Sequence, residues 1–152
     1  MEAFELAPEP LNVAGYRALA RRKLPRGIFE YVDRGTEDEV SLDDNRRAFE
    51  ALKFVPSVLR DVTDVSFDVE LFGRRQALPL AIAPTAVAGL VAYDGETRVA
   101  RAAARAGIPF CVSTQSITAM EGIASGSGAR LWFQLYVFRD RSMCRRSLAV
   151  KN

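Results

Sequence analysis

The chain has 152 residues, a formal net charge of +2 and 49% hydrophobic residues, values typical of one ordinary globular domain. Acidic and basic side chains are interspersed without a basic stripe, which gives nucleic-acid binding no support. Histidine is absent and the two cysteines lack metal-ligand spacing, which argues against a metal site. Prolines interrupt the longest uncharged stretch, residues 76–93, and no apolar signal segment is present, so we expect a cytoplasmic protein without evident membrane association.

The first third of the chain, residues 1–53, predicts a helical lead-in. Asn12 is a suitable N-cap for a first helix, and Pro25 suits the first turn of a second. Gly35 is expected to end that helix in a left-handed conformation. A third helix is expected to follow the acidic segment 37–39, because its apolar residues are spaced by helical turns.

The periodicity then changes to that of strands. Within residues 54–77, Val69 and Leu71 alternate with acidic side chains ahead of Gly73, a pattern typical of a half-buried strand or hairpin. From residue 78 onward, apolar strands alternate with helices. The predicted strands are residues 78–83, 108–112 and 131–136; the predicted helices are 96–106 with Asp94 as cap and Gly107 at its end, 119–124 with Thr118 and Glu121 at capping-box spacing, and a third beginning at Asp140.

Apolar strands that alternate with helices predict a parallel sheet covered on both faces. A doubly wound sheet and the start of a (β/α)₈ barrel both satisfy this pattern. A nucleotide-binding doubly wound sheet usually has a glycine-rich turn after its first strand, and the turn at residues 84–89 lacks that fingerprint. We therefore favour an α/β fold, a partial (β/α)₈ TIM barrel in which residues 78–152 supply the first three barrel strands.

Polar residues gather where the three predicted strands end. The segments at these ends are Pro84-Thr85-Ala86, then Ser113-Thr114-Gln115, then Gln134 and Tyr136. In both folds the carboxyl ends of parallel strands form the functional edge of the sheet. Contact with water would also explain polar strand ends. Gln134 and Tyr136 nevertheless interrupt an apolar strand, where a buried amide or hydroxyl costs about 1–3 kcal/mol unless it is hydrogen-bonded.

A longer set of segments carries a family resemblance. The run LPRGIFEYVDRG, residues 24–35, precedes Glu37-Asp38-Glu39 and Asn45-Arg46, and further matching segments are residues 78–86, 94–96, 106–109, 112–114 and 131–137. In this order, over roughly residues 12–142, they resemble the N-terminal part of the FMN-dependent 2-hydroxyacid dehydrogenases and oxidases. Members of that family include glycolate oxidase, L-lactate dehydrogenase and mandelate dehydrogenase.

The resemblance implies FMN as cofactor and the oxidation of an L-2-hydroxyacid, lactate- or mandelate-like, to the 2-oxoacid. It places Tyr31 at the substrate carboxylate and makes Tyr136 a catalytic tyrosine at the substrate hydroxyl. The backbone of Pro84, Thr85 and Ala86 would pack against the flavin ring, which Ser113 and Gln134 would also contact. For Tyr31 the alternative is a core position on its helix. We expect Thr85, Ser113, Gln134 and Tyr136 to converge beside Tyr31.

The chain departs from the family pattern in one respect. The family's active-site histidine, two arginines and lysine lie beyond the third strand, and this sequence has no histidine. A full barrel typically has ~250 residues. We therefore expect a truncated or frameshifted reading frame that is inactive alone. The alternatives are a non-catalytic half-barrel or flavin-binding module that needs a complementing C-terminal half or self-association, and a non-functional gene fragment.

Overall fold

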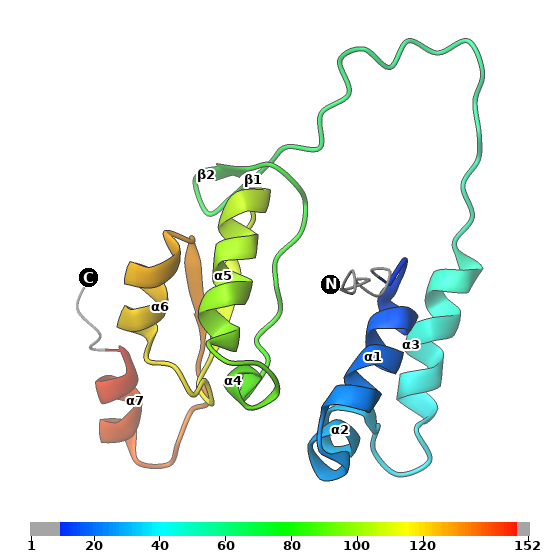
Figure 1. Cartoon of the computed structure of the whole chain (residues 1–152). Helices are drawn as coiled ribbons and strands as arrows, with labels where there is room; N and C mark the ends of the chain where they lie inside the picture. The colour runs from blue at the N-terminus through cyan, green and yellow to red at the C-terminus, as the bar shows by residue number, and fades with distance from the viewer. Residues whose placement is uncertain (1–9, 149–152) are drawn as a thin grey trace, which may run out of the picture. The chain divides into compact units, whose positions relative to one another are not determined.

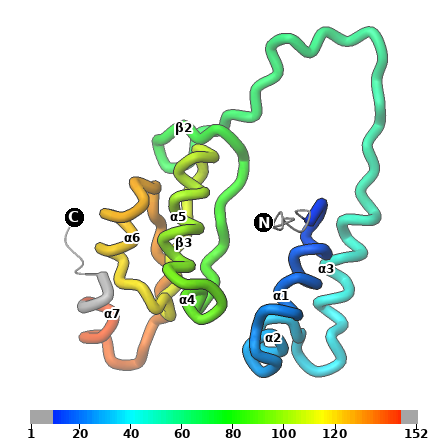
Figure 2. The backbone as a smooth tube through the Cα atoms, in the orientation of Figure 1, coloured from blue at the N-terminus to red at the C-terminus, as the bar shows by residue number. Residues whose placement is uncertain are grey.

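The computed structural model describes residues 10–148, and these divide into two compact units at Arg60 and Asp61 (Figure 1). The backbone between Ala51 and Val69 forms neither helix nor strand (Figure 2). Within the described residues, no helix is both long enough and apolar enough to cross a membrane.

Three helices make up the N-terminal unit: α1 (Val13–Lys23), α2 (Arg26–Asp33) and α3 (Val40–Ala51). The Asn12 side chain accepts a hydrogen bond from the Gly15 amide over 2.8 Å, so the predicted cap of α1 is confirmed. Helix α2 begins directly after Pro25, also as predicted. Arg17 and Asp33 form a two-point ion pair that joins α1 to α2.

The predicted role of Gly35 is wrong. Helix α2 ends at Asp33, and its C-cap residue Arg34 is extended rather than left-handed. Gly35 has no positive φ; its amide donates to the Glu39 carboxylate over 3.0 Å. A Cβ at Gly35 would lie 3.1 Å from that of Leu42, so close packing rather than an unusual turn favours glycine here.

The C-terminal unit opens with a hairpin of β1 (Val69–Leu71) and β2 (Arg74–Gln76), which pair antiparallel. Phe72 and Gly73 connect them with φ values of 52° and 69°. Two consecutive positive φ values characterise the tight turns that match the twist of paired strands. The Phe72 ring packs edge-on against Trp132, with ring centroids 5.4 Å apart, and so holds the hairpin against the sheet.

The rest of this unit is a small parallel α/β structure, which confirms the predicted α/β class. Its strands are β3 (Phe110–Ser113) and β4 (Leu131–Gln134), paired in parallel. Its helices are α4 (Ala88–Val91), α5 (Gly95–Ala106), α6 (Met120–Ser127) and α7 (Arg141–Leu148). The core combines residues of α5, β3 and α6: Ala100, Ala103, Phe110, Val112 and Ile123.

The first predicted strand, residues 78–83, is reduced to a single parallel bridge between Ile82 and Phe110. The Ile82 amide donates to the Pro109 carbonyl, and the Ile82 carbonyl accepts from the Cys111 amide, both over 3.0 Å. Pro79 and Pro84 have no amide hydrogen to extend this ladder.

The last predicted strand also proved shorter than residues 131–136. Strand β4 stops at Gln134, because the Tyr136 amide donates to the Thr114 hydroxyl instead of continuing a backbone ladder.

Two predicted helix caps were wrong. Asp94 precedes α5 with a left-handed φ of 53°, and its side chain makes no capping hydrogen bond. Helix α6 begins at Met120 after Ala119, again without a side-chain cap, and the Thr118 hydroxyl bonds to Glu96 instead. Helices α5 and α6 each end at a glycine, Gly107 and Gly128. Both glycines adopt the left-handed conformation favoured after a helix.

Candidate functional site

The two faces of the β3–β4 pair differ in character. Phe110 and Val112 of β3 belong to the core formed with α5 and α6, and Phe133 packs against that core. Both helices therefore cover the same face of the sheet, whereas the sequence pattern predicted cover on both faces. Side chains alternate along a strand, so the opposite face is formed by the remaining residues of the two strands: Cys111, Ser113, Trp132 and Gln134.

Ser113 and Gln134 are register partners at the carboxyl end of this second face. Ser113 is buried, and its hydroxyl accepts a hydrogen bond from the Gln115 amide over 3.1 Å. The Gln134 side-chain oxygen accepts from the Thr114 amide over 3.4 Å. Among the described residues, no acceptor is found for the Gln134 amide nitrogen. A buried serine and an available amide donor thus lie side by side.

Thr114 connects the ends of the two strands. Its hydroxyl donates to the Gln134 carbonyl and accepts from the Tyr136 amide over 3.2 Å. The backbone immediately after β4 is therefore held against the loop after β3. Tyr136 is 51% exposed, and its position next to this connection leaves its phenol accessible.

The loop that contains Pro84, Thr85 and Ala86 is attached to the same end of the sheet. The Val87 amide donates to the Gln115 carbonyl over 3.2 Å. Pro84 and Thr85 are exposed and Ala86 is half-buried, so the backbone before Val87 is open to a ligand. Hydrogen bonds thus join the three strand-end segments of the C-terminal unit: Val87 to Gln115, and Thr114 to Gln134 and Tyr136.

Tyr31 lies on α2 in the N-terminal unit and is 67% exposed. Within its unit it does not occupy the core position considered as the alternative. Its expected place beside Thr85, Ser113, Gln134 and Tyr136 stays a prediction.

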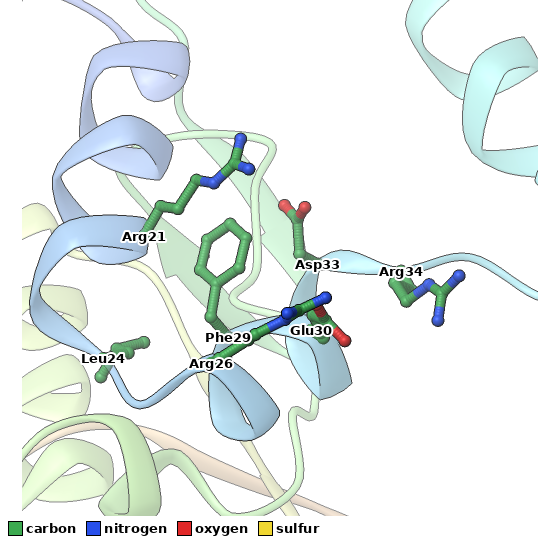
Figure 3. Close-up of a pocket in the computed structure, with 7 residues that line it drawn as sticks. All are labelled: Arg21, Leu24, Arg26, Phe29, Glu30, Asp33 and Arg34. Carbon is green, nitrogen blue, oxygen red and sulfur yellow. The ribbon is translucent and has the colours of Figure 1, made fainter.

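A hollow in the N-terminal unit contains none of the predicted site residues. It lies beside α1 and α2, and Figure 3 shows charged side chains around it. Arg26 and Glu30 form an ion pair there over 2.7 Å, on an exposed helix surface. Exposed pairs of this kind contribute little to stability. The lining residues are Arg21, Leu24, Arg26, Phe29, Glu30, Asp33 and Arg34.

Sequence reasoning missed the buried carboxylate of Glu96. This residue is only 1% exposed, although it lies in the first turn of α5, where a solvated acid would be ordinary. Its oxygens accept hydrogen bonds from the Ile117 amide over 3.2 Å and the Thr118 hydroxyl over 3.1 Å. The only sequence signal is the segment Asp94-Gly95-Glu96, which carries part of the family resemblance but does not indicate burial.

The fold and this site define a class of protein: a parallel α/β structure with polar groups at the carboxyl ends of its strands. A model of the family described as FMN-dependent dehydrogenase matches residues 20–151. The chain belongs to the FMN-dependent dehydrogenase family, which confirms the resemblance seen in the sequence.

Individual relatives agree with this assignment. The chain is 42% identical over 137 residues to an L-lactate dehydrogenase of Pseudomonas syringae pv. syringae (strain B728a), covering 90% of this chain and 36% of that protein. It is 44% identical over 138 residues to a 4-hydroxymandelate oxidase of Amycolatopsis orientalis, with 91% and 38% covered.

A solved structure is also similar: a soluble mutant of the membrane-associated (S)-mandelate dehydrogenase from Pseudomonas putida. Its TM-score is 0.81 at 40% identity, over 90% of this chain and 40% of the other. The chain therefore spans little more than a third of the length of the curated relatives it matches.

The residues present suit the edge of a flavin. An isoalloxazine ring has both hydrogen-bond donors and acceptors, and it needs a flat surface on which to pack. Gln134 offers an amide, Ser113 a hydroxyl, and residues 84–86 an accessible backbone.

Proposed function

We propose that this chain forms the first part of a (β/α)₈ barrel that binds FMN and oxidises an L-2-hydroxyacid, lactate- or mandelate-like, to the 2-oxoacid. Two relatives, an L-lactate dehydrogenase and a 4-hydroxymandelate oxidase, support this substrate class by their names. The observation that carries the proposal is the opposition of Ser113 and Gln134 on the face of β3 and β4 opposite the core formed with α5 and α6. In a barrel, that face lines the interior, and its carboxyl end lines the active site.

Each residue has a role within this proposal. The backbone of Pro84, Thr85 and Ala86 supports the flavin ring, while Ser113 and Gln134 hydrogen-bond to its polar edge. When bound, FMN would supply the acceptor for the hydride equivalent that leaves the substrate.

Two tyrosines bind the substrate. The accessible phenol of Tyr136 binds and orients the substrate hydroxyl, and the phenol of Tyr31 donates to the substrate carboxylate.

The family resemblance assigns the role of proton acceptor to a histidine. This sequence has no histidine, so these 152 residues do not supply that group. We expect these 152 residues alone to bind FMN weakly, in the cytoplasm, and to turn over no 2-hydroxyacid. Neither expectation changes which groups form the flavin wall, namely the backbone of residues 84–86 and the side chains of Ser113 and Gln134.

A chimera tests the proposed function. This chain replaces the matching N-terminal segment of the Pseudomonas syringae L-lactate dehydrogenase, and the purified product is examined for bound flavin and lactate-dependent dye reduction. Yellow protein that reduces the dye supports the proposal, and Tyr136→Phe in the chimera should lower the rate while the flavin stays bound. A folded chimera that never retains flavin would contradict it.

A second candidate is a non-catalytic half-barrel that needs a separately made partner. Residues 52–67 carry eight large apolar side chains that are at least half exposed: Leu52, Phe54, Val55, Val58, Leu59, Val62, Val65 and Phe67. Buried Gln76 has no hydrogen-bond partner for either side-chain polar atom among the described residues. Both features indicate surfaces that further protein would cover. Co-expression with the C-terminal portion of a relative should yield a soluble complex, whereas an insoluble chain in both cases opposes this candidate.

A further inference from the structure

The buried carboxylate of Glu96 contacts two chain segments at once, the loop after β3 and the start of α4. In the loop after β3, it accepts hydrogen bonds from the Ile117 amide and the Thr118 hydroxyl. In the short helix α4, which follows residues 84–87, it accepts a hydrogen bond from the Gly89 amide. A Cβ at Gly89 would lie 3.1 Å from a Glu96 oxygen, so the carboxylate sits directly against that backbone.

Hydrogen-bond donors rather than cations compensate the charge. Among the described residues, no arginine or lysine forms an ion pair with Glu96. Burial raises its pKa, but the amides of Glu96, Gly89 and Ile117 and the Thr118 hydroxyl hold the pKa below the ordinary value. The group is therefore ionised at neutral pH. A buried anion is tolerated only while its donors stay in place, so movement of either loop is costly.

We propose that Glu96 is a positioning residue that fixes residues 84–90, the first loop with the start of α4, relative to the second loop, residues 114–118. This inference rests on the proposed function, because the first loop carries the flavin-packing backbone and the second follows Ser113. The Val87–Gln115 backbone hydrogen bond of 3.2 Å joins the same two loops at a second point. Glu96 thereby sets the distance between the ring-supporting backbone and the Ser113 hydroxyl before FMN arrives.

The experiment compares Glu96→Ala and Glu96→Gln with wild type in the full chain. Glu121→Gln is the matched control, since Glu121 also lies in the first turn of a helix but is exposed. Amide hydrogen exchange of Gly89 and Ile117 reports on the loops, and that of Ile108 and Phe110 reports on the core. An FMN titration followed by amide chemical shifts in nuclear magnetic resonance spectra measures affinity in the same samples.

We expect Glu96→Ala to speed exchange of the two loop amides at least tenfold, to leave the core amides unchanged, and to weaken FMN binding about tenfold. Glu96→Gln should be intermediate, because its amide oxygen still accepts a hydrogen bond from one loop. Unchanged loop exchange, or equal acceleration of loop and core, would overturn the inference. Equal FMN affinity for wild type and Glu96→Ala would overturn it while the proposed function stands. If wild type fails to bind FMN although the loops respond, the proposed function fails and the loop-holding role survives.

Discussion

Ser113 and Gln134 oppose each other in register at the carboxyl ends of β3 and β4, on the sheet face that α5 and α6 leave uncovered. The hydroxyl of the next residue, Thr114, bonds to the backbone on both sides of Leu135. The Thr114 side chain therefore fixes the spacing between the ends of β3 and β4. This arrangement places a hydroxyl and an amide at a constant separation without help from a ligand.

Replacing Gln134 by leucine should weaken FMN binding by the chain about tenfold. The change removes one ligand hydrogen bond, which contributes about 1–1.5 kcal/mol, while it keeps the volume of the side chain similar. Titration followed by nuclear magnetic resonance measures the effect. Gln115→Leu is the control, because the Gln115 side chain is exposed in the neighbouring loop. Equal losses in the two variants would remove Gln134 from the flavin wall.

Thr114→Val should destabilise the C-terminal unit by about 1–3 kcal/mol, because it leaves the Gln134 carbonyl and the Tyr136 amide without their shared partner. Urea denaturation followed by circular dichroism gives the free energy of unfolding. Thr114→Ser keeps the hydroxyl and should recover most of the stability. If the valine variant is as stable as wild type, the hydrogen bonds of Thr114 contribute nothing to the free energy of unfolding.

Gly95→Ala should destabilise the same unit by about 1–3 kcal/mol. A Cβ at Gly95 would lie 2.5 Å from the Ala88 carbonyl oxygen, so α4 and α5 would have to separate. Gly122→Ala is the matched helical control, since the nearest atom to its Cβ would be 3.8 Å away. That variant should be neutral or slightly stabilising through its helix propensity. If the two variants unfold at the same midpoint temperature in thermal melts, close packing at Gly95 is refuted.

Acid should destabilise wild type more steeply than Glu96→Gln. The folded-state pKa of Glu96 lies below its ordinary value of 4.5, so its ionised form stabilises the fold above that pH. This contribution is lost as pH falls from about 4.5 through the folded-state pKa. Denaturation free energies measured between pH 7 and pH 3 should show the smaller slope in the glutamine variant. Identical slopes would contradict a lowered pKa at this position.

Much of the fold follows from local sequence patterns. Helices α1, α2 and α5 and the parallel strands β3 and β4 were predicted because apolar periodicity and helix signals agree at those positions. The predictions at Gly35, Asp94 and Thr118 were wrong, and at Thr118 a tertiary partner replaced the expected local one. Thr118 shows this clearly, since its hydroxyl bonds to a carboxylate on the preceding helix instead of capping its own.

The candidate site was predictable in part for the same reason. Ser113 and Gln134 were named because strand ends in a parallel sheet converge, and the register places them opposite each other. Glu96 was not predictable, because two of its partners are the backbone amides of Gly89 and Ile117. Every residue type except proline has a backbone amide hydrogen, so the sequence gives almost no sign of such a contact.

The most direct test of the flavin wall is an FMN titration of the isotope-labelled chain, followed residue by residue through its amide chemical shifts. This measurement detects millimolar binding, so weak affinity does not prevent it. We predict concentration-dependent shifts at Thr85, Ala86, Ser113 and Gln134, with Gly122 on α6 unaffected. Shifts confined to residues outside these strand ends, or none at millimolar FMN, would contradict the account.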